Sequence, residues 1–423
     1  MSTTIKNKII LYVVSTILLA WFTGTAEGVA QTLRQELADG VVLNVHTEDT
    51  ELLEGSNYPQ EVLQAACSAY QEIVFNQGFN RQNYTFACAS QFFAYDSDQT
   101  IDIYLTQVDG PYSLCQPQGG LEYQASIYLP ADYNSYRERY NITDFDSELK
   151  ASLTHELLHI ITYSYNRNME TTAQSKNSIT SERWDWYTEG LARYFEALVG
   201  YRDEFLSSGF RKNVGDKVMV YKGGVNYFLR YPDRPLNERK YDFALFWQYL
   251  HRTYGMEKIE QISSQFRAVD PAVCSGQQAM QIIADTLGVE LNVLLQDFSL
   301  YLFEVSSLPA KKEAGLEAVS ITKFLSSRNQ RTQDSICSFG FDFYALEVDK
   351  GMESISLSTF GRAEDLNCLV GIYSPSAFQA FAATAEDLGR IKIDAREFPQ
   401  GSKIILMLSN PTNQSISYNI TLD

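Results

Sequence analysis

The feature that most constrains the fold is a pair of histidines, His155 and His159, which flank Glu156 in an apolar segment of the form HExxH. The apolar residues of this segment recur at mostly three- and four-residue steps, which predicts a buried α-helix; they are Leu149, Leu153, Leu157, Ile160 and Ile161. On such a helix both imidazoles lie on one face, about one turn apart. One interpretation is that the two histidines are core residues whose polar atoms are satisfied by hydrogen bonds. The other is that they bind a metal ion, which would also offset the cost of burying the Glu156 carboxylate.

The metal reading assigns a different role to each side chain of the motif. Zinc binds imidazole nitrogen at about 2.0–2.1 Å, and catalytic sites commonly have three protein ligands and a position open to water. His155 and His159 would be two of the ligands. Glu156 lies about 100° further round the helix than His155, so its carboxylate is expected beside the metal-activated water. There it would act as general base, on a water whose pKa zinc lowers to about 7.

A third ligand must come from elsewhere, because HExxH also arises by chance in unrelated helices. The only histidine downstream is His251, and the spacing of the longer HExxHxxGxxH motif is absent. Glu189 is the better candidate, because it begins a second segment with apolar residues at helical spacing. Glu196 follows about two turns later on the same face. It is expected either to orient a metal-bound histidine or to be a solvated surface residue.

The HExxH motif and the run Trp186–Glu196, of the form WxxEGxAxxxE, together resemble the gluzincins, the thermolysin-like branch of the zinc metallopeptidases. The resemblance implies that His155, His159 and Glu189 bind Zn²⁺. It implies that Glu156 is the general base that activates water for hydrolysis of a peptide or protein substrate. It also implies an α+β, zincin-like catalytic domain with a mixed-sheet lobe, a helical lobe and the metal between them.

The resemblance extends to the segment before the active-site helix. Residues 119–130 alternate as a strand does, and in the family such a strand pairs with the extended substrate through an exposed edge. Gly119–Tyr123 also resembles the GxMEN motif of gluzincin aminopeptidases, with Leu121 in place of methionine and Tyr123 in place of asparagine. In that alternative, Glu122 would bind the α-amine of the substrate.

The developing oxyanion of a peptidase needs a hydrogen-bond donor. Gluzincins often supply a tyrosine or histidine after the third ligand, and both Tyr241 and His251 lie in one apolar run here. Tyr241 is the first candidate, with a packing role as the alternative.

The net charge and the N-terminal segment limit which partners and which cellular compartment are expected. A net charge of −18 argues against nucleic acid or an anionic membrane surface as a partner. Lys6 and Lys8 precede an apolar run, Ile9–Phe22, and then small residues, which predicts a secretory signal peptide at 1–30. The run is short for a bilayer-spanning helix, which needs about 20 residues, although an uncleaved anchor is the alternative. We therefore expect a secreted, extracellular or periplasmic protein with no other membrane segment.

An even number of cysteines behind a signal peptide predicts three disulfides. The first choice of pair is Cys337–Cys368 and the second is Cys67–Cys88, although the sequence does not fix the pairing. The six cysteines are Cys67, Cys88, Cys115, Cys274, Cys337 and Cys368.

The pattern along the chain predicts two folded parts after the signal peptide. Residues 31–310 are expected to form the metallopeptidase domain, with a sheet lobe at about 40–145, active-site helices at 145–200 and a helical lobe at 201–310. From about 315 to 423 short alternating runs separated by turn residues predict an antiparallel β-sandwich. Helices are expected at 243–254, 259–266, 277–287 and 291–303, and strands at 341–348, 354–358, 369–373, 403–408 and 417–422.

Four interpretations remain open on the sequence. The leading one is a secreted zinc endopeptidase, and the second is an aminopeptidase that uses Glu122. The third is a non-catalytic surface or adhesion protein on a zincin scaffold, against which the intact Glu156 argues. The fourth is a helical binding domain in which the HExxH match arose by chance, and such a domain should carry no stoichiometric zinc. No pattern in the chain indicates the oligomeric state or the side-chain preference.

Overall fold

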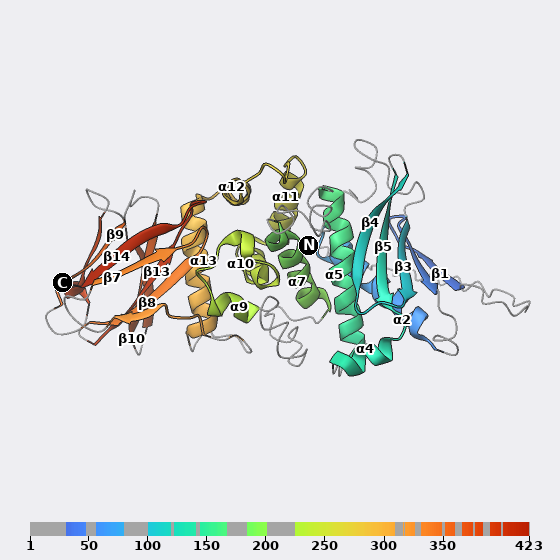
Figure 1. Cartoon of the computed structure of the whole chain (residues 1–423), viewed down its shortest axis with the longest axis horizontal. Helices are drawn as coiled ribbons and strands as arrows, with labels where there is room; N and C mark the ends of the chain where they lie inside the picture. The colour runs from blue at the N-terminus through green and yellow to red at the C-terminus, as the bar shows by residue number, and fades with distance from the viewer. Residues whose placement is uncertain are drawn as a thin grey trace, which may run out of the picture.

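The structure is a computed structural model of the whole chain. It describes residues 31–47, 56–79, 100–119, 122–140, 144–166, 184–200, 225–308, 316, 318–325, 331–348, 352–359, 366–374, 377–383, 390–398 and 401–422. The expected signal peptide at 1–30 lies outside the described residues. Along the long axis of the molecule a sheet with covering helices is followed by a group of helices and then by a β-rich C-terminal region (Figure 1). The fold is therefore mixed α and β, as expected.

The first part is a five-stranded sheet in the order β1-β2-β3-β5-β4. The three central strands are parallel, and the edge strands β1 and β4 run antiparallel to their neighbours. Alternate residues such as Leu43, Ile103 and Ile127 are fully buried against α2 and α5, because a strand points successive side chains to opposite faces. The elements are β1 (Gln31–Glu36), β2 (Val42–Thr47), α2 (Tyr58–Gln71) with a π-helical turn (Glu72–Asn76), β3 (Thr100–Thr106), β4 (Tyr112–Gly119), β5 (Glu122–Pro130), α4 (Tyr133–Tyr140) and α5 (Phe145–Tyr165).

The expectation that the strand before the active-site helix is the exposed edge was wrong. That strand is β5, and it lies between β3 and β4 in the sheet. The edge is formed by β4, which contacts α5 and runs beside it in Figure 1.

The helix α5 carries the HExxH motif. Asp144 precedes it, and its side chain accepts a hydrogen bond from the Ser147 amide, which satisfies one of the free N–H groups of the first turn. The apolar stripe predicted from the sequence is buried in full, with Leu149 at 2% exposure and Leu153 at 0%.

A second helix, α7 (Asp185–Phe195), continues into a π-helical turn (Glu196–Gly200) and packs against α5. The approach is close at Gly200, where an added Cβ would lie 2.3 Å from the Ala151 Cα. Ala151 is one helical turn before His155, so this contact brings the two predicted ligand-bearing helices together.

The helical part follows the predicted segments within a few residues. Trp186 and Trp247 stack in its interior, with ring centroids 6.3 Å apart. The helix α12 begins with a capping box between Ser275 and Gln278, and it ends at Gly288, whose φ of 75° suits glycine. The elements are α9 (Val225–Arg230), α10 (Ala244–Tyr254), α11 (Met256–Phe266), α12 (Gly276–Leu287), α13 (Leu291–Ser307) and the 3₁₀ turns η5 (Leu236–Glu238) and η6 (Tyr241–Phe243).

The C-terminal region contains two sheets in the orders β11-β10-β13-β8-β6 and β12-β9-β14-β7. Their facing sides enclose one core, which includes Tyr344, Leu406 and Tyr418. The outer side of the first sheet packs on α13, so Phe343 and Met407 belong to the core of the helical part. The strands are β6 (Lys323–Leu325), β7 (Arg331–Ile336), β8 (Phe341–Glu347), β9 (Ser354–Thr359), β10 (Asn367–Ser374), β11 (Ala377–Ala383), β12 (Arg390–Asp394), β13 (Lys403–Ser409) and β14 (Ile416–Leu422).

The predicted disulfide between Cys337 and Cys368 was wrong, because both are free thiols. Cys67 is also free, and Cys88, its second-choice partner, lies outside the described residues. Burial raises the pKa of the Cys368 thiol to about 12, so this cysteine is an inert core residue. Among the described helices, none combines the length and the apolar character that crossing a bilayer would require.

Candidate metal centre

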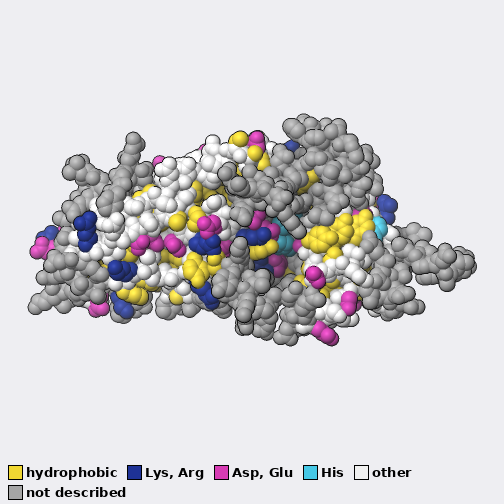
Figure 2. Space-filling view, in the orientation of Figure 1, with side chains coloured by type: hydrophobic (Ala, Val, Ile, Leu, Met, Phe, Trp, Pro, Cys, Tyr) yellow, Lys and Arg dark blue, Asp and Glu magenta, His cyan; other side chains and the backbone are white. Residues whose placement is uncertain are grey.

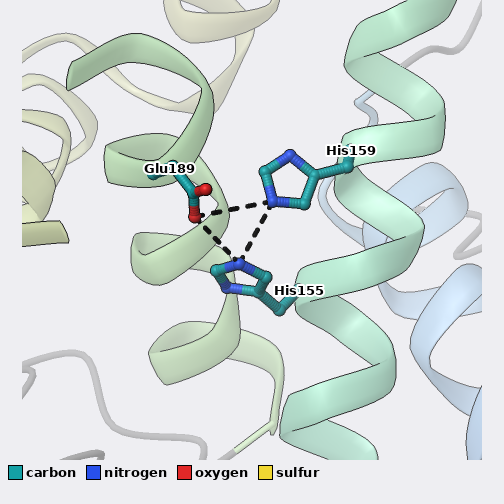
Figure 3. A group of neighbouring side chains, drawn as sticks. All are labelled: His155, His159 and Glu189. Atoms are coloured by element: carbon teal, nitrogen blue, oxygen red, sulfur yellow. Dashed lines mark hydrogen bonds and ion pairs between the residues drawn. The ribbon is translucent and has the colours of Figure 1, made fainter. Parts of the chain in front are cut away.

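Three side chains from α5 and α7 converge on one point (Figure 3). The His155 and His159 Nε2 atoms are 3.1 Å apart, and the Glu189 Oε2 atom lies 3.3 Å from the first and 3.7 Å from the second. Three atoms at these separations lie about 2.0 Å from a common centre, which is the length of a zinc bond to nitrogen or oxygen. These three residues form a group that could hold a metal ion.

The Glu189 Oε2 atom is buried and lacks a partner with hydrogen-bond geometry among the described residues. A buried carboxylate oxygen in that state is costly unless a cation satisfies it. Two imidazole nitrogens and one carboxylate oxygen are also a donor set that suits zinc. The residues therefore fit a divalent metal, and Zn²⁺ in particular.

The Nδ1 atom of His155, which faces away from the convergence point, is in contact with a carboxylate. It lies 3.2 Å from the Glu196 Oε2 atom, and Arg193 pairs with the second oxygen of Glu196. Glu196 is 6% exposed, so the surface-residue alternative was wrong. An imidazole whose Nδ1 donates to a carboxylate presents a bare Nε2 to a metal, which is the orienting contact expected at such sites.

The pocket stabilises positive charge at the position of the imidazoles. Burial alone would lower the pKa of His155, but the contacts with Glu189 and Glu196 outweigh it and raise this pKa to about 9. Burial likewise favours the neutral form of Glu189, yet the two histidines and Lys240 keep its pKa well below the usual range. The Lys240 Nζ atom lies 3.4 Å from the Glu189 Oε1 atom and 3.4 Å from the Asp185 carboxylate.

Glu156, the residue predicted to be the base, directly follows His155 in the sequence. It is on α5, 7% exposed, and makes no hydrogen bond or ion pair with another described residue. Its charge nevertheless contributes to the raised pKa values of His155 and Tyr241, so the carboxylate lies near both. Its carboxylate therefore lies beside the candidate metal centre, with no hydrogen-bond partner among the described residues.

The structure brings Tyr241 to the centre and gives His251 a different partner. The Tyr241 and His155 ring centroids are 5.9 Å apart. Burial, and then the charge of Glu189, raise the pKa of Tyr241 well above its usual value, so its hydroxyl remains a donor at neutral pH. The His251 Nδ1 atom is instead hydrogen-bonded to the Tyr194 hydroxyl.

The side chains of the centre are partly open to solvent. Those of His155, His159 and Glu189 are 12%, 13% and 18% exposed. Histidine and acidic side chains reach the surface together in the middle of the face shown in Figure 2, in the region where Figure 1 places α7. The side chain of Glu122, the candidate for binding a substrate amine, lies outside the described residues.

Two residues of the centre were missed on the sequence. The pairing of Arg193 with Glu196 could have been predicted, because Arg193 precedes Glu196 by about one helical turn on the same helix. No pattern in the sequence indicated the contact of Lys240 with Glu189, because the two residues lie far apart along the chain.

No protein-family model matches this chain, and no curated protein matches it significantly. Among solved structures, the pre-peptidase C-terminal domain of collagenase from Bacillus anthracis is 13% identical, with 24% of this chain and 92% of that chain covered and a TM-score of 0.18. The lysozyme inhibitor PliG of Salmonella Typhimurium is 14% identical, with 24% and 98% covered and a TM-score of 0.16. Legionella pneumophila aminopeptidase A is 12% identical, with 86% and 36% covered and a TM-score of 0.36. At these TM-scores none of the likenesses bears on the activity of this chain.

Proposed function

We propose that this chain is a secreted zinc-dependent peptidase of the gluzincin type, in which His155, His159 and Glu189 hold Zn²⁺. The observation that carries the proposal is the convergence of their three ligand atoms around one point, at 3.1, 3.3 and 3.7 Å from one another. Secretion through residues 1–30 and a zincin-like two-lobe domain at 31–310, followed by a β-sandwich domain at 315–423, belong to the same proposal.

A bound Zn²⁺ would polarise the scissile carbonyl and lower the pKa of the attacking water. Glu156 takes a proton from that water and passes it to the leaving amine. No other described residue makes a hydrogen bond or ion pair with its carboxylate. Tyr241 donates a hydrogen bond to the oxyanion that develops on the carbonyl. Glu196 keeps His155 in one ring orientation throughout.

The substrate is a peptide in extended conformation. The edge strand β4 adjoins α5 and has no neighbour on its outer side in the described sheet. An extended peptide can add to such an edge through backbone hydrogen bonds. This pairing is independent of side-chain identity, which suits a peptidase that acts on unfolded protein.

The test is the Glu156→Gln variant, assayed for zinc content and for cleavage of an unfolded protein substrate. We expect full zinc occupancy with turnover reduced by about 10²–10⁴-fold, because only the base is lost. Asp146→Asn, in the exposed first turn of the same helix, is the matched control and should cleave like the parent. Equal turnover by the Glu156 variant and the parent would refute the mechanism. Zinc binding without turnover in the parent would favour the non-catalytic surface protein instead.

A further inference from the structure

The C-terminal β region contacts the backbone of residues 231–242, a segment that ends at the candidate metal centre. We call residues 231–242 the connecting segment. The Phe341 amide donates to the Pro232 carbonyl at 2.9 Å, and the Leu236 amide donates to the Ser338 carbonyl at 3.3 Å. At Gly340 an added Cβ would lie 2.4 Å from the Asp233 carbonyl oxygen, so the two backbones are in direct contact there.

Inside the connecting segment, Arg239 fixes the backbone in one shape. Its side chain is 1% exposed and lies over the Phe228 ring at 3.8 Å. It donates at 2.8 Å to the Pro232 carbonyl, the same oxygen that accepts from Phe341. It is also paired with Asp242 at 2.9 Å. The guanidinium therefore joins the contact with the β region to the far end of the segment.

That far end contacts the third metal ligand. The Lys240 amide donates to the Asp242 carboxylate at 2.9 Å, which positions the lysine backbone. The Lys240 carbonyl lies only 3.2 Å from where a Cβ on Gly190 would be, so it packs on α7 next to Glu189. From there the Lys240 ammonium reaches the Glu189 Oε1 atom and leaves Oε2 facing the histidines.

We propose that the C-terminal β region, residues 316–422, is a positioning element of the metal centre. Through the connecting segment it holds Lys240 and Tyr241 against Glu189, and so keeps one oxygen of that carboxylate aimed at the metal. The inference rests on the proposed function only in that the centre binds a divalent metal. Groups that orient a metal ligand from outside commonly contribute about 10–100-fold to metal affinity.

The experiment measures Co²⁺ affinity of the full chain by competition with a chelator, together with the visible absorption of the bound Co²⁺. Gly340→Ala forces the β region and the Asp233 backbone apart. We expect Co²⁺ to bind about 10-fold more weakly and its spectrum to change, because Glu189 loses its fixed orientation. Gly371→Ala is the matched control in the same region, where the new Cβ meets the Phe378 ring at 2.7 Å and not the connecting segment. It should lower thermal stability without changing Co²⁺ affinity.

Unchanged Co²⁺ affinity in Gly340→Ala, or an equal loss in Gly371→Ala, would overturn the proposal. If Gly340→Ala does not fold, Asn410→Ser makes the same comparison. Its parent amide donates to the Ile336 and Cys337 carbonyls at 3.2 and 3.1 Å and so holds the turn that contains Gly340. A parent chain that binds no Co²⁺ would instead overturn the proposed function, which is a distinguishable outcome.

Discussion

Replacing Asp342 by asparagine should remove a pH-dependent contribution to stability that lies in the C-terminal β region. Asp342 is 2% exposed and accepts hydrogen bonds from the hydroxyls of Tyr418 and of Thr322, the latter at 3.0 Å. Tyr344 joins the same cluster, 2.7 Å from the Tyr418 hydroxyl and 2.8 Å from the Asp334 carboxylate. Burial is the largest influence on Asp342, and with the charge of Asp334 it raises the pKa from 3.8 to about 6 despite the hydroxyl donors.

The direction of the effect follows from the raised pKa. Between pH 3.8 and about 6 the folded chain holds a proton that the unfolded chain releases. This contribution to stability is therefore fully present below pH 3.8 and is lost as the pH rises through about 6. At about 1.36 kcal/mol per pKa unit, the contribution of the Asp342 carboxyl is about 3 kcal/mol.

The assay is urea unfolding of the parent and Asp342→Asn at a series of pH values from 4 to 7. Other carboxyl groups titrate in both proteins, so their contributions cancel in the difference between the two free energies of unfolding. That difference should move by about 2.4 kcal/mol in favour of the variant between pH 4 and pH 7, because a small part of the contribution is already lost at pH 4. Asp285→Asn, at an exposed position on α12, should show no such movement. A difference that is constant with pH would refute the reasoning.

The remaining predictions concern the metal centre. Glu196→Gln should weaken zinc binding about 10–100-fold in a chelator competition, because His155 loses the carboxylate that orients it; unchanged affinity would mean that the contact is only structural. Tyr241→Phe should lower kcat about 10²–10³-fold at full zinc occupancy if its hydroxyl stabilises the oxyanion, whereas an effect on KM alone would point to substrate binding. Gly200→Ala should lower both the unfolding temperature and zinc occupancy, because its Cβ would lie 2.3 Å from the Ala151 Cα; wild-type zinc content would show that the helices separate without moving the ligands.

The helices could be predicted closely because their signal is local. The helical spacing around His155 identified α5, and the segment expected at 291–303 is present as Leu291–Ser307. The ends differ because they depend on contacts outside the window. The Ser306 hydroxyl, for example, accepts from the Val319 amide at 3.1 Å, which anchors the last turn of α13 to a distant residue.

The order of strands could not be predicted in the same way. Alternation identified β5 as a strand but gave no information on its neighbours. The true edge, β4, contains Pro117 and ends at Gly119, and these residues obscure its alternation. Proline is tolerated at an edge because it has no N–H to donate to a neighbouring strand. The residue that hid β4 on the sequence is therefore consistent with its place at the edge.

The disulfide prediction failed because it was based only on the number of cysteines. An even number of cysteines carries no information on where they lie, whereas a disulfide needs its two Cβ atoms about 3.5–4.5 Å apart. Cys368 points into the core between the two C-terminal sheets, and Cys337 lies at the end of β7 outside that core.

The candidate metal centre combines a local part and a long-range part, and only the first is visible on the sequence. His155, Glu156 and His159 share one helix, so their spacing alone determines how they face. The orientation of Glu189 depends instead on Lys240, whose position depends on Arg239 and on the Pro232 carbonyl. That carbonyl also accepts from β8, in a region that on its sequence looked like a separate module. A helical motif can thus identify candidate ligands of such a centre, whereas the contacts proposed to hold Glu189 in place extend through the connecting segment to the C-terminal β region.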